Sequence, residues 1–210
     1  MLKKTSEQIA ERREEIVNAC EKLYQTMSFK EITLKEIGEE VPFSRPTIYN
    51  SFQTKEEIFL ALFEREYDRW NEALIGILDS NESLTKNELA SKIAASVTER
   101  EQLLKLLSMN IYDMEANSRP EILTSFKRAY GASINNISGL LEKFCPEMSV
   151  DDISRFLYMF FPFMFGIYPY TSVTDKQRKA MEEAEIGYVY HSVYELTYSC
   201  LCRLLGTEQK

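Results

Sequence analysis

The stretch from Thr33 to Lys55, TLKEIGEEVPFSRPTIYNSFQTK, has the pattern of two short helices joined by a tight turn, followed by the start of a third. Thr33 with Glu36 three residues later is the pattern of a capping box, which predicts that the first of these helices begins there. Pro42 donates no N–H and disfavours a helical residue before it, so this helix is expected to end at Val41.

The next two helices begin at polar residues of the same kind. Ser44 is placed to cap the second helix, and Thr54 with Glu57 predicts a capping box at the start of the third. Apolar residues recur at helical spacing on one side of the first two helices, namely Leu34, Ile37 and Val41, then Ile48 and Phe52. The second helix is left with an outward face that is mostly basic, hydroxylic or amide and has no carboxylate: Arg45, Pro46, Thr47, Tyr49 and Asn50.

Two short amphipathic helices, a turn of three to four residues and a polar outward face make a helix-turn-helix, the motif that lays its second helix in the major groove of DNA. In that position, Arg45 could read guanine and Asn50 adenine through paired hydrogen bonds. The alternative is an ordinary pair of packed helices, because turns of this kind occur in any all-α protein.

The segment Ser28–Phe63 resembles the DNA-binding domain of the tetracycline-repressor (TetR/AcrR-type) family of bacterial transcriptional regulators. The resemblance covers about residues 6–64. The chain departs from the family's pattern at the turn, Val41-Pro42-Phe43, and has Ser28 where the family usually has glycine. The matching features, in order, are Thr33, the apolar run after it, Ser44, the aromatic pair Tyr49 and Phe52, and Lys55 followed by two acidic residues.

The resemblance implies roles at the matching positions. It implies phosphate contacts for Thr33, Tyr49 and Lys55, and a homodimer that binds a palindromic operator in double-stranded DNA through two recognition helices about 34–36 Å apart. The dimer would be joined through the last two long helices, at about residues 151–168 and 184–205. The whole set of expected DNA-binding residues is Thr33, Ser44, Arg45, Pro46, Thr47, Tyr49, Asn50 and Lys55.

Composition agrees with a helical protein in two parts. The 210 residues are 44% hydrophobic and include only seven Gly and six Pro, which fits long helices rather than many turns. The net charge is −8, so overall charge gives no argument for nucleic acid. Residues 1–55 carry nine Lys/Arg and nine Asp/Glu, whereas the remainder carries sixteen basic and twenty-four acidic residues. A neutral head on an acidic body is consistent with DNA touching only the head.

The cysteines and the apolar runs exclude several other classes. Four cysteines at this length indicate no disulfide framework, and Cys200-x-Cys202 with the single His191 lacks the spacing of a zinc site. No metal or other cofactor is therefore expected, and Cys20 is expected to be a buried thiol. The N-terminus has no apolar signal segment, and the longest apolar run, residues 156–170, is too short to span a bilayer. A cytoplasmic protein with no membrane partner is expected.

Helical periodicity continues along the chain and predicts an all-α fold of about nine helices without strands. Residues 1–54 are expected to form the helix-turn-helix domain and residues 55–210 a helical bundle for ligand binding and dimerisation. The fourth helix, residues 55–79, would link the two domains as a rod of about 35–40 Å. The other helices are expected over residues 5–27, 85–96, 98–116, 120–144, about 149–168 and 184–205, with residues 171–183 mostly loop.

Aromatic and methionine side chains gather on the predicted helices of the C-terminal part. The resemblance implies a ligand cavity there, so an unidentified small hydrophobic or aromatic effector is expected. Pro162 and Pro169 are expected to unwind the central helix and open space. The alternative is a plain packed core. The candidate ligand residues are Trp70, Met109, Tyr112, Phe126, Tyr130, Phe160, Phe163, Met164 and Tyr168.

The sequence thus predicts a DNA-binding transcriptional regulator, a repressor that a small hydrophobic or aromatic ligand releases from a palindromic operator. Activation by the ligand is the other direction that the sequence leaves open. The alternative function is a ligand-binding or structural helical dimer without specific DNA binding. No enzyme activity is expected, because the chain has one histidine, no Gly-rich phosphate loop and no catalytic constellation.

Overall fold

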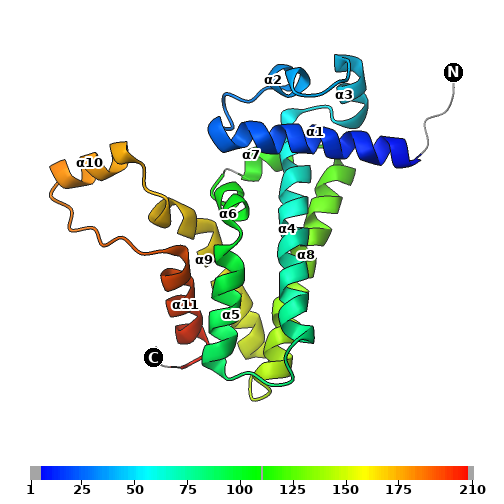
Figure 1. Ribbon diagram of the computed structural model, residues 1–210. Helices are drawn as coiled ribbons and strands as arrows, with labels where there is room; N and C mark the ends of the chain where they lie inside the picture. Colours follow the sequence, from blue (N-terminus) through cyan, green and yellow to red (C-terminus); the bar gives the residue numbers. More distant parts are fainter. Residues whose placement is uncertain (1–5, 110, 208–210) are drawn as a thin grey trace. The chain divides into compact units, whose positions relative to one another are not determined.

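The computed structural model describes residues 6–109 and 111–207 of the chain. Every regular element in these residues is an α-helix, as Figure 1 shows, so the predicted all-α class is confirmed, with eleven helices rather than nine. The helices are α1 Ser6–Thr26, α2 Leu34–Glu39, α3 Arg45–Ser51, α4 Lys55–Asp79, α5 Lys86–Thr98, α6 Glu101–Leu107, α7 Ile111–Ala116, α8 Pro120–Phe144, α9 Val150–Thr171, α10 Asp175–Glu183 and α11 Val193–Leu204.

The helices form two compact units. Of the described residues, the first unit contains 6–65 and 111–129, and the second contains 66–109 and 130–207. Helices α4 and α8 each begin in the first unit and continue into the second. No pattern in the sequence indicates that residues 111–129 group with the helix-turn-helix.

The core of the first unit joins α1 to the first part of α4. The ring of Phe59 lies edge-on to Tyr24, with 5.2 Å between centroids, and to Phe29, at 4.8 Å. Arg65 binds Glu14 and Glu21 of α1 at 2.6 and 2.7 Å.

Cys20 also lies in this core, fully buried, which confirms the buried thiol expected from the sequence. Burial raises its pKa to about 12, so the group stays a neutral thiol at physiological pH.

Aromatic side chains fill the core of the second unit. Tyr130 packs edge-on against Tyr67 at 5.6 Å and against Phe161 at 5.5 Å, and Phe161 contacts Trp70 at 6.1 Å. The indole N–H of Trp70 donates to the Ser96 hydroxyl at 3.1 Å, which satisfies the polar atom of this fully buried ring. Helix α11 packs against α5 and α9, and α6 packs against α9.

Helix α9 differs from the prediction in two ways. It remains helical through Pro162 and Pro169, so the expected unwinding is wrong. Both prolines lie on an exposed side, where water can bind the carbonyls that a missing N–H leaves free. Its apolar composition is typical of a helix buried at the centre of a bundle, but Tyr158 is 81% exposed and Tyr170 61%. One apolar face of α9 is therefore bare.

Two predicted helices are wrong in extent. Residues 98–116 form α6 and α7 instead of one helix, and Ser108, the C-cap of α6, donates its hydroxyl to the Lys105 carbonyl. Residues 185–192 are not helical, and α11 starts only after Ser192, which makes a capping box with Glu195. The run Gly187–Tyr190 combines glycine, valine and tyrosine, all poor helix formers, which explains the late start.

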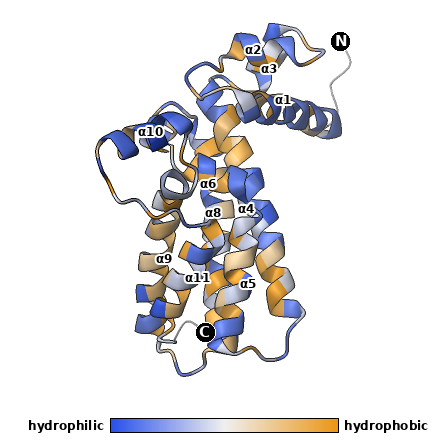
Figure 2. Cartoon of the chain, turned by 60° about the vertical axis from the view of Figure 1, so that its left-hand side comes forward, coloured by the Kyte–Doolittle hydropathy of each residue, from blue (hydrophilic) through white to orange (hydrophobic). Residues whose placement is uncertain are grey.

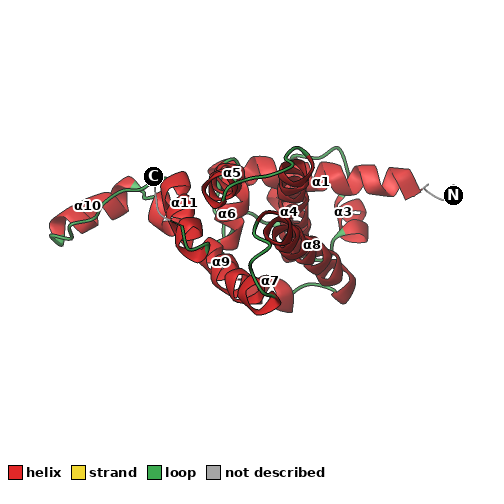
Figure 3. Cartoon of the chain, turned by 90° about the horizontal axis from the view of Figure 1, so that it is seen from below, coloured by secondary structure: helices red, strands yellow, loops and turns green. Residues whose placement is uncertain are grey.

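Residues 171–183 were expected to be mostly loop, but Asp175–Glu183 form helix α10. None of the residues of this helix is buried. Figure 2 shows it as mainly hydrophilic, and Figure 3 shows that it projects from α9 and α11 of the same unit. None of the helices in the described residues is both long and apolar enough to cross a membrane.

The Trp70–Ser96 bond yields a stability prediction. Replacing Ser96 by alanine leaves the buried indole N–H without its acceptor, so the free energy of unfolding should fall by about 1–3 kcal/mol. Ser108→Ala is the matched control, because Ser108 also donates to a carbonyl three residues earlier but is exposed. Urea unfolding followed by Trp fluorescence measures both. Equal losses of unfolding free energy in the two variants would contradict a stabilising role for the Trp70–Ser96 hydrogen bond.

Candidate DNA-binding surface

A buried seam holds α2 and α3 together. Ile37 of α2 is fully buried, Ile48 of α3 is 1% exposed and Phe52, directly after α3, is fully buried. The two helices approach closely at Gly38, where an added Cβ would lie 3.3 Å from the Ile48 Cδ1. An alanine at position 38 would require the end of the Ile48 side chain to shift by a few tenths of an ångström. Helix α1 packs against both α2 and α3.

The polar residues at the helix starts cap them, with some differences from the prediction. Thr33 is the N-cap of α2, where its side chain accepts from the Lys35 N–H at 3.1 Å and donates to the Glu36 carboxylate. This is a cap without the reciprocal bond of a capping box. Ser44 stands at the N-cap of α3, but its hydroxyl lies 3.2 Å from that of Thr47 and makes no cap bond to the backbone.

The outward face of α3 has the exposure that the sequence predicts. Ser44, Arg45, Pro46 and Asn50 are exposed, Tyr49 is 52% exposed and Thr47 is half-buried. The helix, RPTIYNS, contains no acidic residue, so no carboxylate of its own repels a phosphate. The exposure of Arg45, Pro46, Tyr49 and Asn50 agrees with the predicted outward face, and the contact of these residues with DNA stays a prediction.

A hollow of about 410 Å³ lies beside this face, where the starts of α2 and α4 meet α3. Its rim includes two exposed basic side chains, Lys35 and Arg45. The first N–H groups of a 25-residue helix have no partner within that helix and favour an anion, so the start of α4 suits a phosphate. The lining residues are Thr33, Leu34, Lys35, Arg45, Ile48, Tyr49, Thr54, Lys55 and Glu56.

The sequence prediction missed Lys35. Lys35 lies on the solvent side of α2, two positions after Thr33, which was itself expected to contact a phosphate. This short spacing is the signal from which Lys35 could have been predicted. Thr33, Arg45, Tyr49 and Lys55 of the predicted set line the hollow, whereas Ser44, Pro46, Thr47 and Asn50 are not among its lining residues.

Lys55 has interior partners that the sequence did not indicate. Its ammonium donates to the carbonyls of Phe29 and Ile32 at 2.7 and 3.1 Å and lies 4.1 Å from the centroid of the Phe29 ring. Two of its three donors are thus used inside the unit, where they hold the connection between α1 and α2. A phosphate contact would draw on the third.

The start of α4 also differs from the predicted capping box. Thr54 accepts from the Glu57 N–H at 3.2 Å, but the Glu57 carboxylate accepts from the Gln53 N–H at 2.7 Å and from Arg119. Burial works to raise the pKa of Glu57, yet these hydrogen bonds outweigh it and hold that pKa below the ordinary value. Glu57 therefore stays ionised at physiological pH.

The predicted ligand residues fall in both units. In the first, Phe126 is buried and contacts Phe63 at 5.0 Å, whereas Tyr112 is 80% exposed. In the second, the buried members form part of the aromatic core, and Phe160 stacks on Phe163 at 6.5 Å. Trp70, Phe160 and Met164 are buried there, and Met109, Tyr130, Phe163 and Tyr168 are half-buried.

Comparison with known proteins identifies the family of both parts of the chain. Residues 16–62 match the family described as bacterial regulatory proteins, tetR family, and residues 64–206 match the tetracyclin repressor-like C-terminal domain. A comparison with curated protein sequences finds no match.

Several solved structures share the fold. The transcriptional regulator FadR from Bacillus subtilis, in complex with stearoyl-CoA, is 15% identical, with a TM-score of 0.61 over 93% of this chain and 99% of that one. The FadR repressor from Thermus thermophilus, in complex with lauroyl-CoA, is 18% identical, with a TM-score of 0.59 over 94% and 96%. The fatty acid degradation regulator FadR from Bacillus halodurans is 15% identical, with a TM-score of 0.59 over 98% and 97%.

The two family matches together cover nearly all of the described residues and agree with the all-α fold and the helix-turn-helix at the N-terminus. The chain belongs to the tetR family of bacterial regulatory proteins and is a DNA-binding transcriptional regulator.

Proposed function

We propose that the chain is a dimeric, ligand-responsive repressor that binds a palindromic operator in the cytoplasm and has no catalytic activity. Residues 1–54 would form the DNA-binding domain and residues 55–210 the ligand-binding and dimerisation domain, linked by α4. The observation that carries this proposal is the outward face of α3, which is polar and free of carboxylates and lies beside a hollow with basic residues on its rim.

The proposed face has two kinds of contact. Thr33, Tyr49 and Lys55 would bind phosphates, which set affinity without reading sequence. Ser44, Arg45, Pro46, Thr47 and Asn50 would lie toward the major groove, where Arg45 is suited to guanine and Asn50 to adenine. A single helix of seven residues offers few base contacts, so specific binding requires two copies on one site.

Selection of bound sequences from random duplex DNA tests this function. We expect one palindromic motif whose half-sites lie about one helical turn apart. Tyr49→Ala should weaken binding to all sequences, whereas Arg45→Ala should relax the preference at one base pair, by about 1–3 kcal/mol. Tyr190→Ala, which removes an exposed tyrosine in the unit that does not contain α3, is the control. No enrichment at low salt would refute the proposal.

The bare face of α9 supports the dimer. Tyr158, Pro162, Gly166 and Tyr170 follow one another at four-residue spacing and are all exposed, so they form a continuous apolar strip. An added Cβ at Gly166 would meet nothing within 4 Å, which leaves room for a second backbone to approach. A groove of about 350 Å³ runs beside the strip, between α9 and Leu196 of α11.

A charge placed in this face should separate the dimer. Met159 is 57% exposed beside the strip, and Met159→Arg would bury an unpaired charge at the interface. We expect monomers by light scattering at micromolar concentration, together with loss of operator binding. Val150→Arg adds the same charge to an 85% exposed position on the same helix and should leave the dimer intact. A dimeric Met159→Arg variant would contradict this interface.

The effector is proposed to be a small hydrophobic or aromatic molecule, and long-chain acyl-CoA is the class to test first. Two proteins of the same fold were solved with stearoyl-CoA and lauroyl-CoA. The candidate contacts remain Trp70, Met109, Tyr112, Phe126, Tyr130, Phe160, Phe163, Met164 and Tyr168, of which the exposed Tyr112 has the weakest support.

Operator binding should respond to this class. Adding stearoyl-CoA or lauroyl-CoA is expected to lower operator affinity by about 5- to 150-fold, the usual range of coupling between sites. Coenzyme A without an acyl chain is the control and should have no effect. Fluorescence anisotropy of labelled operator measures all three, and unchanged affinity with both acyl-CoAs would exclude long-chain acyl-CoA as the effector class.

A further inference from the structure

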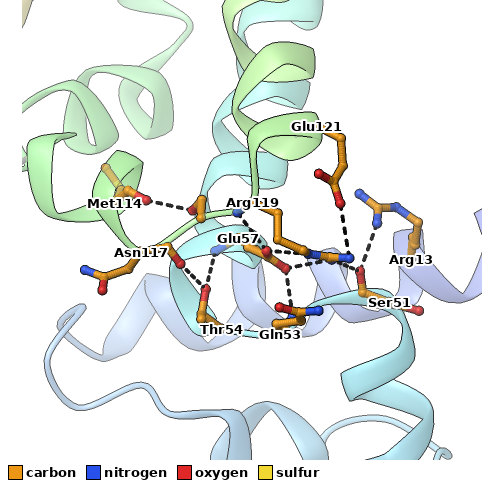
Figure 4. A network of polar contacts seen from close by, with 10 residues as sticks. Arg13, Ser51, Gln53, Thr54, Glu57, Met114, Asn117, Arg119 and Glu121 are labelled. Atoms are coloured by element: carbon orange, nitrogen blue, oxygen red, sulfur yellow. Dashed lines mark hydrogen bonds and ion pairs between the residues drawn. The ribbon is translucent and has the colours of Figure 1, made fainter.

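The C-terminal end of α3 is bound by two arginines. The carbonyl of Ser51, the last residue of the helix, accepts from the Arg13 Nη1 at 3.0 Å and from the Arg119 Nη2 at 3.2 Å (Figure 4). Carbonyls of a helix's last turn have no partner within the helix, and cationic donors there are favoured by the helix dipole. The end of the recognition helix is thus held by groups from outside it.

Arg119 also binds the start of α4. Its Nε and Nη2 donate to the two oxygens of Glu57 at 2.7 and 2.8 Å, and its backbone N–H donates to the same carboxylate at 3.0 Å. Glu57 also accepts from the N–H of Gln53, in the link between α3 and α4. The Arg119 guanidinium therefore joins the last carbonyl of α3 to Glu57 in the first turn of α4, and Glu57 in turn binds the linking peptide.

A further hydrogen bond joins the segment before α8 to the link between α3 and α4. The Thr54 hydroxyl donates to the carbonyl of Asn117 at 2.9 Å, so the turn that precedes α8 contacts the α3–α4 link at two points. The Glu57 side chain is only 1% exposed and that of Arg119 is 30% exposed. A carboxylate that is so buried needs its cationic partner, because an unpaired charge in this position is strongly unfavourable.

We propose that Arg119 is a positioning residue for DNA recognition, which holds α3 at the angle that its outward face needs to read the major groove. This rests on the proposed DNA-binding function. Arg119 follows Ser51 by 68 residues and immediately precedes α8, so the position of the recognition helix is set by the start of α8 as well as by α1. Arg13, by contrast, holds Ser51 from α1.

The test compares full-length wild type with Arg119→Gln, Arg119→Lys and the control Arg128→Gln. Arg128 lies on α8, the helix that Arg119 immediately precedes, and is exposed. The measurements are affinity for the selected operator, affinity for a scrambled duplex of equal length, and amide hydrogen exchange of the peptide that covers α3.

Arg119→Gln should weaken operator binding about tenfold or more, because bonds to charged groups are lost, and leave the scrambled duplex within about twofold. Exchange over α3 should become faster, while exchange over α1 stays unchanged. Arg119→Lys should fall between wild type and Arg119→Gln, since a single ammonium cannot reproduce the fork. Arg128→Gln should match wild type. Wild-type operator affinity and α3 exchange in Arg119→Gln would overturn the proposal.

A second variant separates positioning from simple stabilisation. Arg119→Gln leaves the Glu57 carboxylate buried without its partner, whereas adding Glu57→Gln removes that charge and should recover much of the unfolding temperature. If operator affinity and α3 exchange stay impaired in the double variant, Arg119 acts by positioning. If both return to wild type, its role is stability alone and the proposal fails.

The two proposals can fail separately. If wild type binds no duplex at all, the proposed DNA-binding function is wrong, while hydrogen exchange still reports whether Arg119 holds α3. Unchanged exchange over α3 in Arg119→Gln then refutes the positioning role independently of DNA.

Discussion

Helices of six and seven residues are too short to be stable by themselves, and the recognition surface depends on how α2 and α3 are held. The buried seam of Ile37, Ile48 and Phe52 supplies most of that support, because apolar burial is the main favourable term available to so small a pair. The seam also decides orientation. With Ile48 turned inward, the periodicity of the helix turns Tyr49 and Asn50 outward, and Arg45 is exposed in the first turn.

Polar contacts fix the orientation of α3, which the apolar seam alone would leave adjustable. Hydrophobic contact is non-directional, whereas the fork of a guanidinium has a fixed geometry. Arg119 binds both the end of α3 and Glu57 at the start of α4. The buried Glu57 carboxylate is ionised at physiological pH, because its pKa lies below the ordinary value. Lys55 likewise holds the connection between α1 and α2 through the carbonyls of Phe29 and Ile32. The outward face of α3 is therefore supported by charged groups whose hydrogen bonds are made within the unit.

The second unit has apolar residues both in its interior and on one exposed face. Its interior aromatic rings contact one another closely around Trp70 and Tyr130, as in a packed core. Helix α9 carries a second apolar face that its own chain leaves exposed, from Tyr158 to Tyr170. A monomer rarely exposes a continuous apolar strip without an interaction that covers it, which is why we propose that a second copy covers this face.

The sequence by itself determined the helical class, the helix-turn-helix and the outward side chains of α3. It also determined where α5 and α9 begin, at Thr85 and Ser149, which make capping boxes. These features depend on neighbours three or four residues apart, so they can be read locally. The tertiary structure decided that Arg119 binds Ser51 and Glu57 and that Lys55 turns inward. It also decided that one face of α9 stays bare. Such contacts join positions tens of residues apart, and they follow from the path of the whole chain, which local periodicity does not specify.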